Sequence, residues 1–170
     1  MQGAVDAIQT LANSQVKSVA ICLLNSFANS MHEEELAKLV QSLAPNIAVS
    51  LSSKVLPEIG EFERTGTTVI NAYLLPVLGS YLDSLLRRLR HENYTGPLFM
   101  LQSGGGMIGI KAAQEQPVRL VESGPAAGVI AHLLADSRNG TEQRDSFRHG
   151  WNHCQSIVYP RWRSLTLSRT

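Results

Sequence analysis

Apolar and polar residues alternate along this chain in blocks that predict strands and helices in turn. Val16 to Leu24 is a nearly continuous apolar run, which is typical of a strand buried in a parallel sheet. Ile47 to Leu51 is a second short run of this kind. We expect helices around these strands, one over 3–12 and one from Asn29 or Ser30 to Leu43. This alternation predicts an α/β fold.

A long helical pattern follows in the middle of the chain. Apolar residues recur at helical spacing from Thr67 to Arg90, which corresponds to about six turns. Pro76 is expected to kink this helix or to mark its restart. Pro57 to Arg64 is predicted to be an acidic connector. Glu33, with the two glutamates that follow it, is expected in the first turns of the preceding helix, where carboxylates favour the helix dipole.

Predicted strands and helices also alternate in the part of the chain after the long helix. We expect strands at 98–101 and 118–121, a short helix at 108–114 and a helix at 125–135. Ser123 is placed to cap the last helix, and Pro125 lies in its first turn, where the missing N–H costs nothing.

Two short glycine-rich segments, Ser103–Gly106 and Ser123–Gly128, are predicted at strand-to-helix corners. Glycine permits a positive φ and close approach of the backbone, and helix starts offer unpaired N–H donors, so such corners suit phosphate groups. Neither segment matches a known nucleotide-binding fingerprint. Tight turns without a ligand therefore remain the alternative.

Longer motifs carry a specific resemblance. The segments Ser50–Thr65 and Thr67–Leu74, followed by the two glycine segments, closely resemble the hydantoinase A and 5-oxoprolinase family in order and spacing, from about Val16 to Asp136. Acetone carboxylase subunits look similar over the same stretch. The resemblance implies ATP-dependent opening of a cyclic amide ring, or ATP-dependent carboxylation, on an actin-like ATPase (ribonuclease H-like) fold. It also implies a second, hydantoinase B-type subunit or domain as partner.

The resemblance assigns candidate residues, with ATP and Mg as the cofactors of the intact family. The cofactor-binding candidates are Ser103, Gly104, Gly105, Gly106, Ser123, Gly124 and Gly128. Ser103 is more typical of a loop serine bonded to its own backbone than of a nucleophile, and no catalytic residue is assigned. Glu58, Glu61 and Arg64 are substrate or structural candidates, or else a solvated connector face on which Arg64 pairs with Glu61.

The same resemblance divides the chain into three parts. Residues 1–66 correspond to the end of the family's N-terminal region and 67–136 to the start of the hydantoinase A domain. Two aspartate-bearing phosphate loops of the family are missing, one upstream of Val16 and one after the second glycine segment. Back-translating Asp145–Ser156 and shifting one base permits Ile-Ala-Phe-Asp-Met-Gly-Gly-Thr-Thr-Ala-Lys-Ala, which contains the second loop. Residues 137–170 are therefore predicted to be a disordered, out-of-frame tail that follows a frameshift near 137–145.

Composition limits the remaining possibilities. The 170 residues are 44% hydrophobic and 17% charged, with a formal charge of +1, and the basic excess lies in the tail, so no nucleic-acid partner is expected. No uninterrupted apolar run approaches the length of a membrane span, so we expect no membrane partner and a cytoplasmic location. His149, His153 and Cys154 suggest part of a zinc site, but a structural site needs four ligands, and we assign no metal.

Three functions remain open from the sequence. The first is a truncated ATP-dependent hydrolase of cyclic amides, of the hydantoin or 5-oxoproline type, that is inactive alone. The alternatives are a piece of an acetone-carboxylase-like carboxylase subunit and a non-catalytic interaction fragment.

Overall fold

The computed structural model describes residues 2–139, 144–150, 153–159 and 165–166, with side chains described from 3 to 131. The chain forms two compact units. The first contains Met1–Leu98 and Ile110–Val118, and the second contains Phe99–Gly109 and Arg119–Thr170. Helices and strands alternate through most of the chain, so the predicted α/β class is confirmed.

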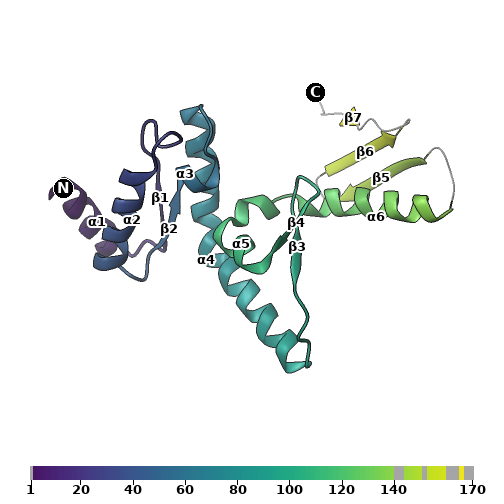
Figure 1. The fold of residues 1–170 in the computed structure, drawn as a ribbon, viewed down its shortest axis with the longest axis horizontal. Helices are drawn as coiled ribbons and strands as arrows, with labels where there is room; N and C mark the ends of the chain where they lie inside the picture. Colours follow the sequence, from purple (N-terminus) through teal and green to yellow (C-terminus); the bar gives the residue numbers. More distant parts are fainter. Residues whose placement is uncertain (1, 140–143, 151–152, 160–164, 167–170) are drawn as a thin grey trace. The chain divides into compact units, whose positions relative to one another are not determined.

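A parallel pair of strands forms the centre of the first unit. Strand β1 (Ser18–Ile21) pairs with β2 (Ala48–Leu51), with Ser18 opposite Ala48 and Ile21 opposite Leu51. The crossover between them contains helix α2 (Met31–Leu43), and helix α1 (Gln2–Asn13) precedes them. Both helices lie on one side of the strand pair, and helix α4 (Glu61–His91) lies on the other (Figure 1).

The apolar core of this unit lies between the strand pair and its first two helices. Its buried residues are Ile8, Val40, Ala44 and Ile47, and half-buried apolar residues of β1 and β2 pack against them. Val40 and Ala44 are four residues apart at the end of α2, so they share one helix face. The helical spacing therefore supplies the apolar face that covers the sheet.

Helix α4 begins earlier than predicted. A short helix, α3 (Ser52–Val55), follows β2, and α4 then runs over 31 residues and includes Pro76 in its interior. The expected connector over 57–64 is wrong at its C-terminal end, because Glu61 to Arg64 form the first turn of the helix. By length and composition α4 could also span a membrane, although its polar residues Thr68 and Asn71 are fully buried against protein. The absence of a membrane partner stays a prediction.

The side chain of Asn71, in α4, links strand β2 to the segment around residues 115–118. Its amide nitrogen donates to Ser50 Oγ at 3.0 Å and to the Glu115 carbonyl at 3.3 Å, and its Oδ1 accepts from the Val118 N–H at 3.1 Å. Glu115 ends helix α5 (Ile110–Glu115), and Val118 lies in the 3₁₀ helix η1 (Pro117–Leu120). One side chain thus holds two elements that are more than 40 residues away in sequence.

The strand predicted at 118–121 is wrong, because η1 occupies most of that stretch. Pro117 has no N–H for a sheet ladder, and the Val118 N–H is bound by Asn71 rather than by a neighbouring strand. The helix predicted at 108–114 starts later, at Ile110, since residues 107–109 form a strand.

The second unit begins with a hairpin. Strand β3 (Phe99–Leu101) pairs antiparallel with β4 (Met107–Gly109), with Met100 opposite Ile108. Helix α6 (Ser123–Asn139) is longer than predicted at both ends. It starts at Ser123 itself, after Glu122 in the left-handed region (φ 59°), so Ser123 lies in the first turn and does not precede it as a cap.

Three strands are described after α6. They are β5 (Arg144–Gly150), β6 (His153–Tyr159) and β7 (Leu165–Thr166), joined in an antiparallel sheet. The rest of the predicted disordered tail, at 140–143, 151–152, 160–164 and 167–170, lies outside the described residues. Its out-of-frame origin stays a prediction.

Replacing Asn71 with alanine should destabilise the first unit by about 2–4 kcal/mol, because the change leaves the buried Ser50 hydroxyl and the Val118 N–H without their partner. Urea unfolding followed by circular dichroism measures this. Ser80→Ala, on the exposed side of the same helix, should change stability by less than about 0.5 kcal/mol. Equal losses for the two variants would show that Asn71 does not hold these elements.

Candidate functional site

The first glycine segment forms the turn of the β3–β4 hairpin. The Gln102 N–H donates to the Gly106 carbonyl at 2.8 Å, and the Gly105 N–H donates to the Gln102 carbonyl at 3.0 Å. Gly105 has φ 84°, a conformation that favours glycine. The expected strand-to-helix corner is therefore wrong for this segment, because the chain returns antiparallel before the next helix begins.

The second glycine segment opens α6, and the structure brings the two segments together within the second unit. The Ser103 N–H and Oγ both donate to the Arg119 carbonyl, at 2.9 and 3.3 Å, four residues before α6 starts. A Cβ added at Gly105 would lie 3.4 Å from Ile130 Cδ1 on α6. Ser103 thus bonds to the segment before α6, and not to its own turn as the sequence suggested.

These contacts define the arrangement of the cofactor-binding candidates. Ser103, Gly104 and Gly106 are exposed in the hairpin turn. Ser123, Gly124 and Gly128 lie in the first two turns of α6, close to the positive end of the helix dipole. The two segments form a backbone-rich surface of turn and helix start, which is suited to an anion.

The three candidates of the connector, Glu58, Glu61 and Arg64, do not form one side-chain cluster in the structure. Glu58 and Glu61 are exposed, whereas Arg64 is 1% exposed. The guanidinium donates to the Glu58 carbonyl at 3.1 Å and to the Leu23 carbonyl at 2.9 Å, and it lies 5.6 Å from the centroid of the Phe27 ring. The expected surface pairing with Glu61 is replaced by these contacts, because the first turn of α4 directs Arg64 inward. Arg64 is thus bound to backbone carbonyls of the first unit, and its role as a substrate or structural candidate stays a prediction.

Sequence reasoning missed the most strongly held carboxylate of the first unit. Glu33 lies in the first turn of α2, as expected, but its side chain is fully buried, and no burial was predicted for it. Its Oε1 accepts from the Ser52 hydroxyl at 2.6 Å and from the Leu23 N–H at 2.9 Å, and its Oε2 accepts from the Ser53 N–H at 2.9 Å. The Ser52 hydroxyl also lies 2.9 Å from that of Ser26.

The chain after β1 is therefore held at one residue by two buried charges. Glu33 accepts the N–H of Leu23, and Arg64 donates to the carbonyl of Leu23. Glu33 also holds the chain after β2 through Ser52 and Ser53, so one carboxylate fixes the carboxyl ends of both parallel strands. In α/β sheets this is the edge at which ligands usually bind.

The pKa of Glu33 reflects this environment. Burial raises the pKa of the carboxyl, but hydrogen bonds from Ser52, Ser53 and Leu23 lower it, and the net pKa is below the ordinary value of 4.5. The carboxylate is therefore charged at neutral pH. A signal for its burial existed in the sequence, since Glu33 lies seven residues before Val40 and on the same face of α2.

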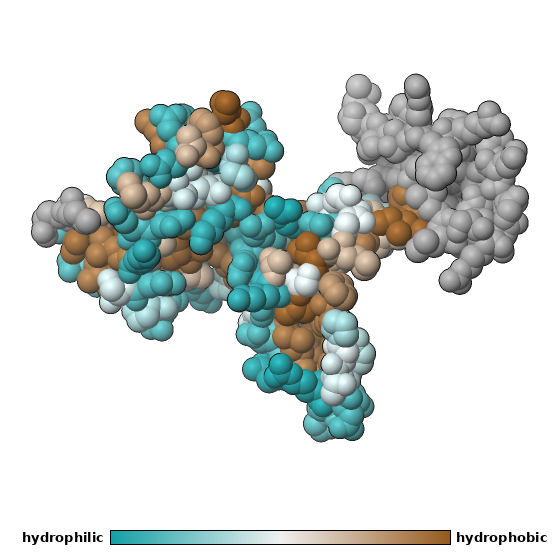
Figure 2. All heavy atoms as spheres, in the orientation of Figure 1, coloured by the Kyte–Doolittle hydropathy of each residue, from teal (hydrophilic) through white to brown (hydrophobic). Residues whose placement is uncertain are grey.

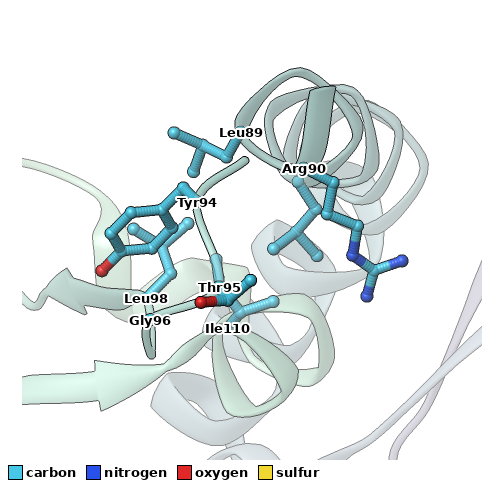
Figure 3. Close-up of a pocket in the computed structure, with 8 residues that line it drawn as sticks. Leu89, Arg90, Tyr94, Thr95, Gly96, Leu98 and Ile110 are labelled. Atoms are coloured by element: carbon cyan, nitrogen blue, oxygen red, sulfur yellow. The ribbon is translucent and has the colours of Figure 1, made fainter. Parts of the chain in front are cut away.

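An open pocket of about 470 Å³ lies at the C-terminal end of α4, in the first unit. Its lining is about equally polar and apolar and comes from α4, the following segment and the start of α5 (Figure 3). Figure 2 shows hydrophobic residues gathered beside this half of α4. Arg90 points away from the Tyr94 ring (Figure 3), and the Tyr94 hydroxyl donates to the Pro97 carbonyl at 2.9 Å. The lining contains no predicted site residue, so we do not place the chemistry there.

Among the described side chains, no group of three or more His, Cys, Asp or Glu residues is arranged to hold a metal ion. The side chains of His149, His153 and Cys154 lie outside the described part.

Comparison with known proteins gives one consistent family. The hydantoinase/oxoprolinase family model matches residues 64–144. The caprolactamase subunit alpha of Pseudomonas jessenii is 35% identical over 127 residues, which are 75% of this chain and 18% of that protein. The 5-oxoprolinase of Saccharomyces cerevisiae is 37% identical over 128 residues, which are 74% of this chain and 9% of that protein.

The fold comparison agrees. The nucleotide-free structure of acetone carboxylase, from work on ATP-dependent acetone carboxylation, superposes with a TM-score of 0.80 at 23% identity and covers 93% of this chain and 22% of that one. The chain thus has a fold of the actin-like ATPase type found in this group, as the resemblance implied. It belongs to the hydantoinase/oxoprolinase family and spans less than a quarter of the length of these relatives.

Replacing Glu33 with glutamine should lower the free energy of unfolding by about 2–3 kcal/mol at pH 7, because a charge-assisted acceptor of three hydrogen bonds is lost. A lowered folded pKa makes the stabilisation fully present above pH 4.5, and it is lost as the pH falls through the folded pKa. The variant should therefore lose less stability than the parent on acidification from pH 5 to 3.

Urea unfolding at several pH values measures both effects. Glu35→Gln, which removes an exposed carboxylate of the same helix, is the matched control and should follow the parent closely. If Glu33→Gln and the parent lose the same stability between pH 5 and 3, the assignment of a charged, buried carboxylate at position 33 is wrong.

Proposed function

We propose that this chain is part of an ATP-dependent hydrolase that opens cyclic amides of the hydantoin or 5-oxoproline type. The single observation that carries the proposal is the junction of the two glycine segments in the second unit, at the Ser103–Arg119 contact. Both segments lie inside the stretch matched by the family model. In this proposal the junction contacts the phosphates of ATP.

The proposed roles follow from the backbone. The start of α6 would face the phosphate oxygens, and the helix dipole would favour their negative charge. The hairpin turn, with Gly104 to Gly106, would approach the nucleotide closely because it carries no side chain beyond Cα. Glu33 and Arg64 do not touch the nucleotide in this proposal; they hold the strand ends of the neighbouring unit.

An acetone-carboxylase-like activity is the second candidate, and the fold likeness at TM-score 0.80 favours it. The sequence comparison favours the first candidate, since relatives at 35% and 37% identity are named as a caprolactamase and a 5-oxoprolinase. Product analysis with 5-oxoproline, hydantoin and acetone plus bicarbonate distinguishes the two candidates.

Three further expectations belong to this proposal. Mg²⁺ would accompany ATP, since metal ions neutralise the charge of transferring phosphates. A hydantoinase B-type subunit or domain would complete the enzyme, and the name of the caprolactamase subunit alpha is compatible with such an assembly in that protein. We place the enzyme in the cytoplasm.

The purified chain by itself should show no turnover and no saturable binding of ATP, because the two aspartate-bearing loops implied by the resemblance are not in its sequence. In a longer form with both loops, Gly124→Val should weaken ATP binding by about tenfold or more through steric exclusion at the helix start. Gly109→Val in β4, where an added Cβ meets nothing within 4 Å, is the control and should bind nearly normally. Calorimetry showing equal affinities would refute the phosphate site.

We also propose that the coding frame changes near residues 137–145. The family model ends its match at Arg144, where the basic residues of the tail begin to accumulate. Sequencing the coding DNA tests this directly: a shift of one base should give codons for Asp-Met-Gly-Gly-Thr opposite Arg148–Asn152. If no shifted frame of the DNA encodes Asp-Met-Gly-Gly-Thr at this position, the proposed frameshift is refuted.

A further inference from the structure

Helix α4 has one face that is buried in the first unit and a second, apolar face that the structure leaves exposed. The face with Asn71, Ala72 and Leu82 is buried in the first unit. A second set of large apolar side chains on the same helix is exposed by half or more: Phe62 (88%), Val69 (50%), Ile70 (50%), Tyr73 (73%), Val77 (60%) and Tyr81 (57%). We call these six residues the outer stripe.

The outer stripe is a continuous surface and not a scatter of single residues. At 3.6 residues per turn its six positions fall within about 120° of the helix circumference. Gly66 lies inside this arc with open space at its Cβ position, so a neighbouring helix can approach closely there. A contiguous exposed surface of this kind marks an interaction site in a soluble protein.

The opposite charges at the two ends of α4 favour an antiparallel copy of the same helix as its partner. Its first turn carries Glu61 and Glu63, and its last turn carries Arg88, Arg90 and His91. A second α4 that runs antiparallel places the acidic end of each helix beside the basic end of the other. A parallel pair would instead place like charges together.

We propose that the outer stripe is the interface of an antiparallel homodimer of this chain, with a two-fold axis near residue 75. In this register Tyr73 of one copy lies opposite Val77 of its partner. Val69 lies opposite Tyr81, and Glu63 lies beside Arg88. Because the two-fold axis makes every such contact twice, each favourable pair counts double.

The available area is sufficient for a specific contact. Three aromatic residues of about 150–250 Å² each, together with three aliphatic residues, are present on each copy. Two such stripes approach the order of 1,000 Å² or more that a stable interface buries. Tyrosine and phenylalanine are also among the residue types enriched at the core of such interfaces.

The test is the mass of the purified full chain by sedimentation equilibrium. The expected mass is twice that of the 18.6 kDa chain at micromolar concentration. Tyr73→Ser with Val77→Ser should raise the dimer Kd about tenfold or more, since both side chains lie next to the axis. Met107→Ser, which removes a 72% exposed apolar side chain from β4, should leave the Kd unchanged.

Charge variants and cross-linking test the orientation. Glu63→Arg and Arg88→Glu should each weaken the dimer, and the two changes together should restore it. In a background without Cys22 and Cys154, a mixture of Glu63→Cys and Arg88→Cys chains should form a disulfide between copies. Neither variant alone should do so, because like positions lie about 37 Å apart along antiparallel helices.

Several outcomes would overturn the proposal. A monomer at micromolar concentration would show that the stripe is not a self-association surface, whether or not a dissimilar subunit covers it. A dimer that is insensitive to the stripe variants, or a disulfide in Glu63→Cys alone, would also refute it. The proposed ATP site is not involved in any of these measurements, so the two proposals fail separately.

Discussion

The structure of the first unit depends on one buried carboxylate. The carboxylate of Glu33 is buried and accepts hydrogen bonds from the Ser52 hydroxyl and from the N–H groups of Ser53 and Leu23. These bonds join α2 to the carboxyl ends of both parallel strands. A buried carboxylate is tolerated only when such donors replace its hydration. The apolar core around Val40 lies on the same face of α2, so the position of the sheet and the position of the charge are set together.

Arg64 completes this arrangement from the other side of the sheet. It donates to the carbonyl of Leu23, whose N–H is held by Glu33, so the two charges act on one peptide segment without forming an ion pair with each other in the described structure. Asn71 extends the same polar layer along α4 to Ser50 and Val118. Buried polar side chains thus join the strands and helices of the first unit, while the candidate phosphate surface lies in the second unit.

The two units therefore serve different purposes in the proposed enzyme. The second unit presents a hairpin turn and a helix start, which are backbone features suited to binding an anion. The first unit presents the outer stripe of α4, which is suited to another helix. The two proposed surfaces are formed by different residues, so separate substitutions test association and nucleotide binding.

The sequence by itself determined the α/β class, the parallel strands, the long helix and the family, because hydrophobic spacing and the sequence motifs within Ser50–Leu74 are local signals. It also singled out the two glycine segments, but of the two only Ser123–Gly128 lies at the start of a helix. Only the tertiary structure decided that Ser103–Gly106 is a hairpin turn, that 117–120 is a 3₁₀ helix, and which distant groups bind the buried side chains of Glu33 and Arg64. Each of these depends on a partner distant in sequence, such as Arg119 for Ser103 or Ser52 for Glu33. Local patterns contain no information about which distant donor satisfies a buried group.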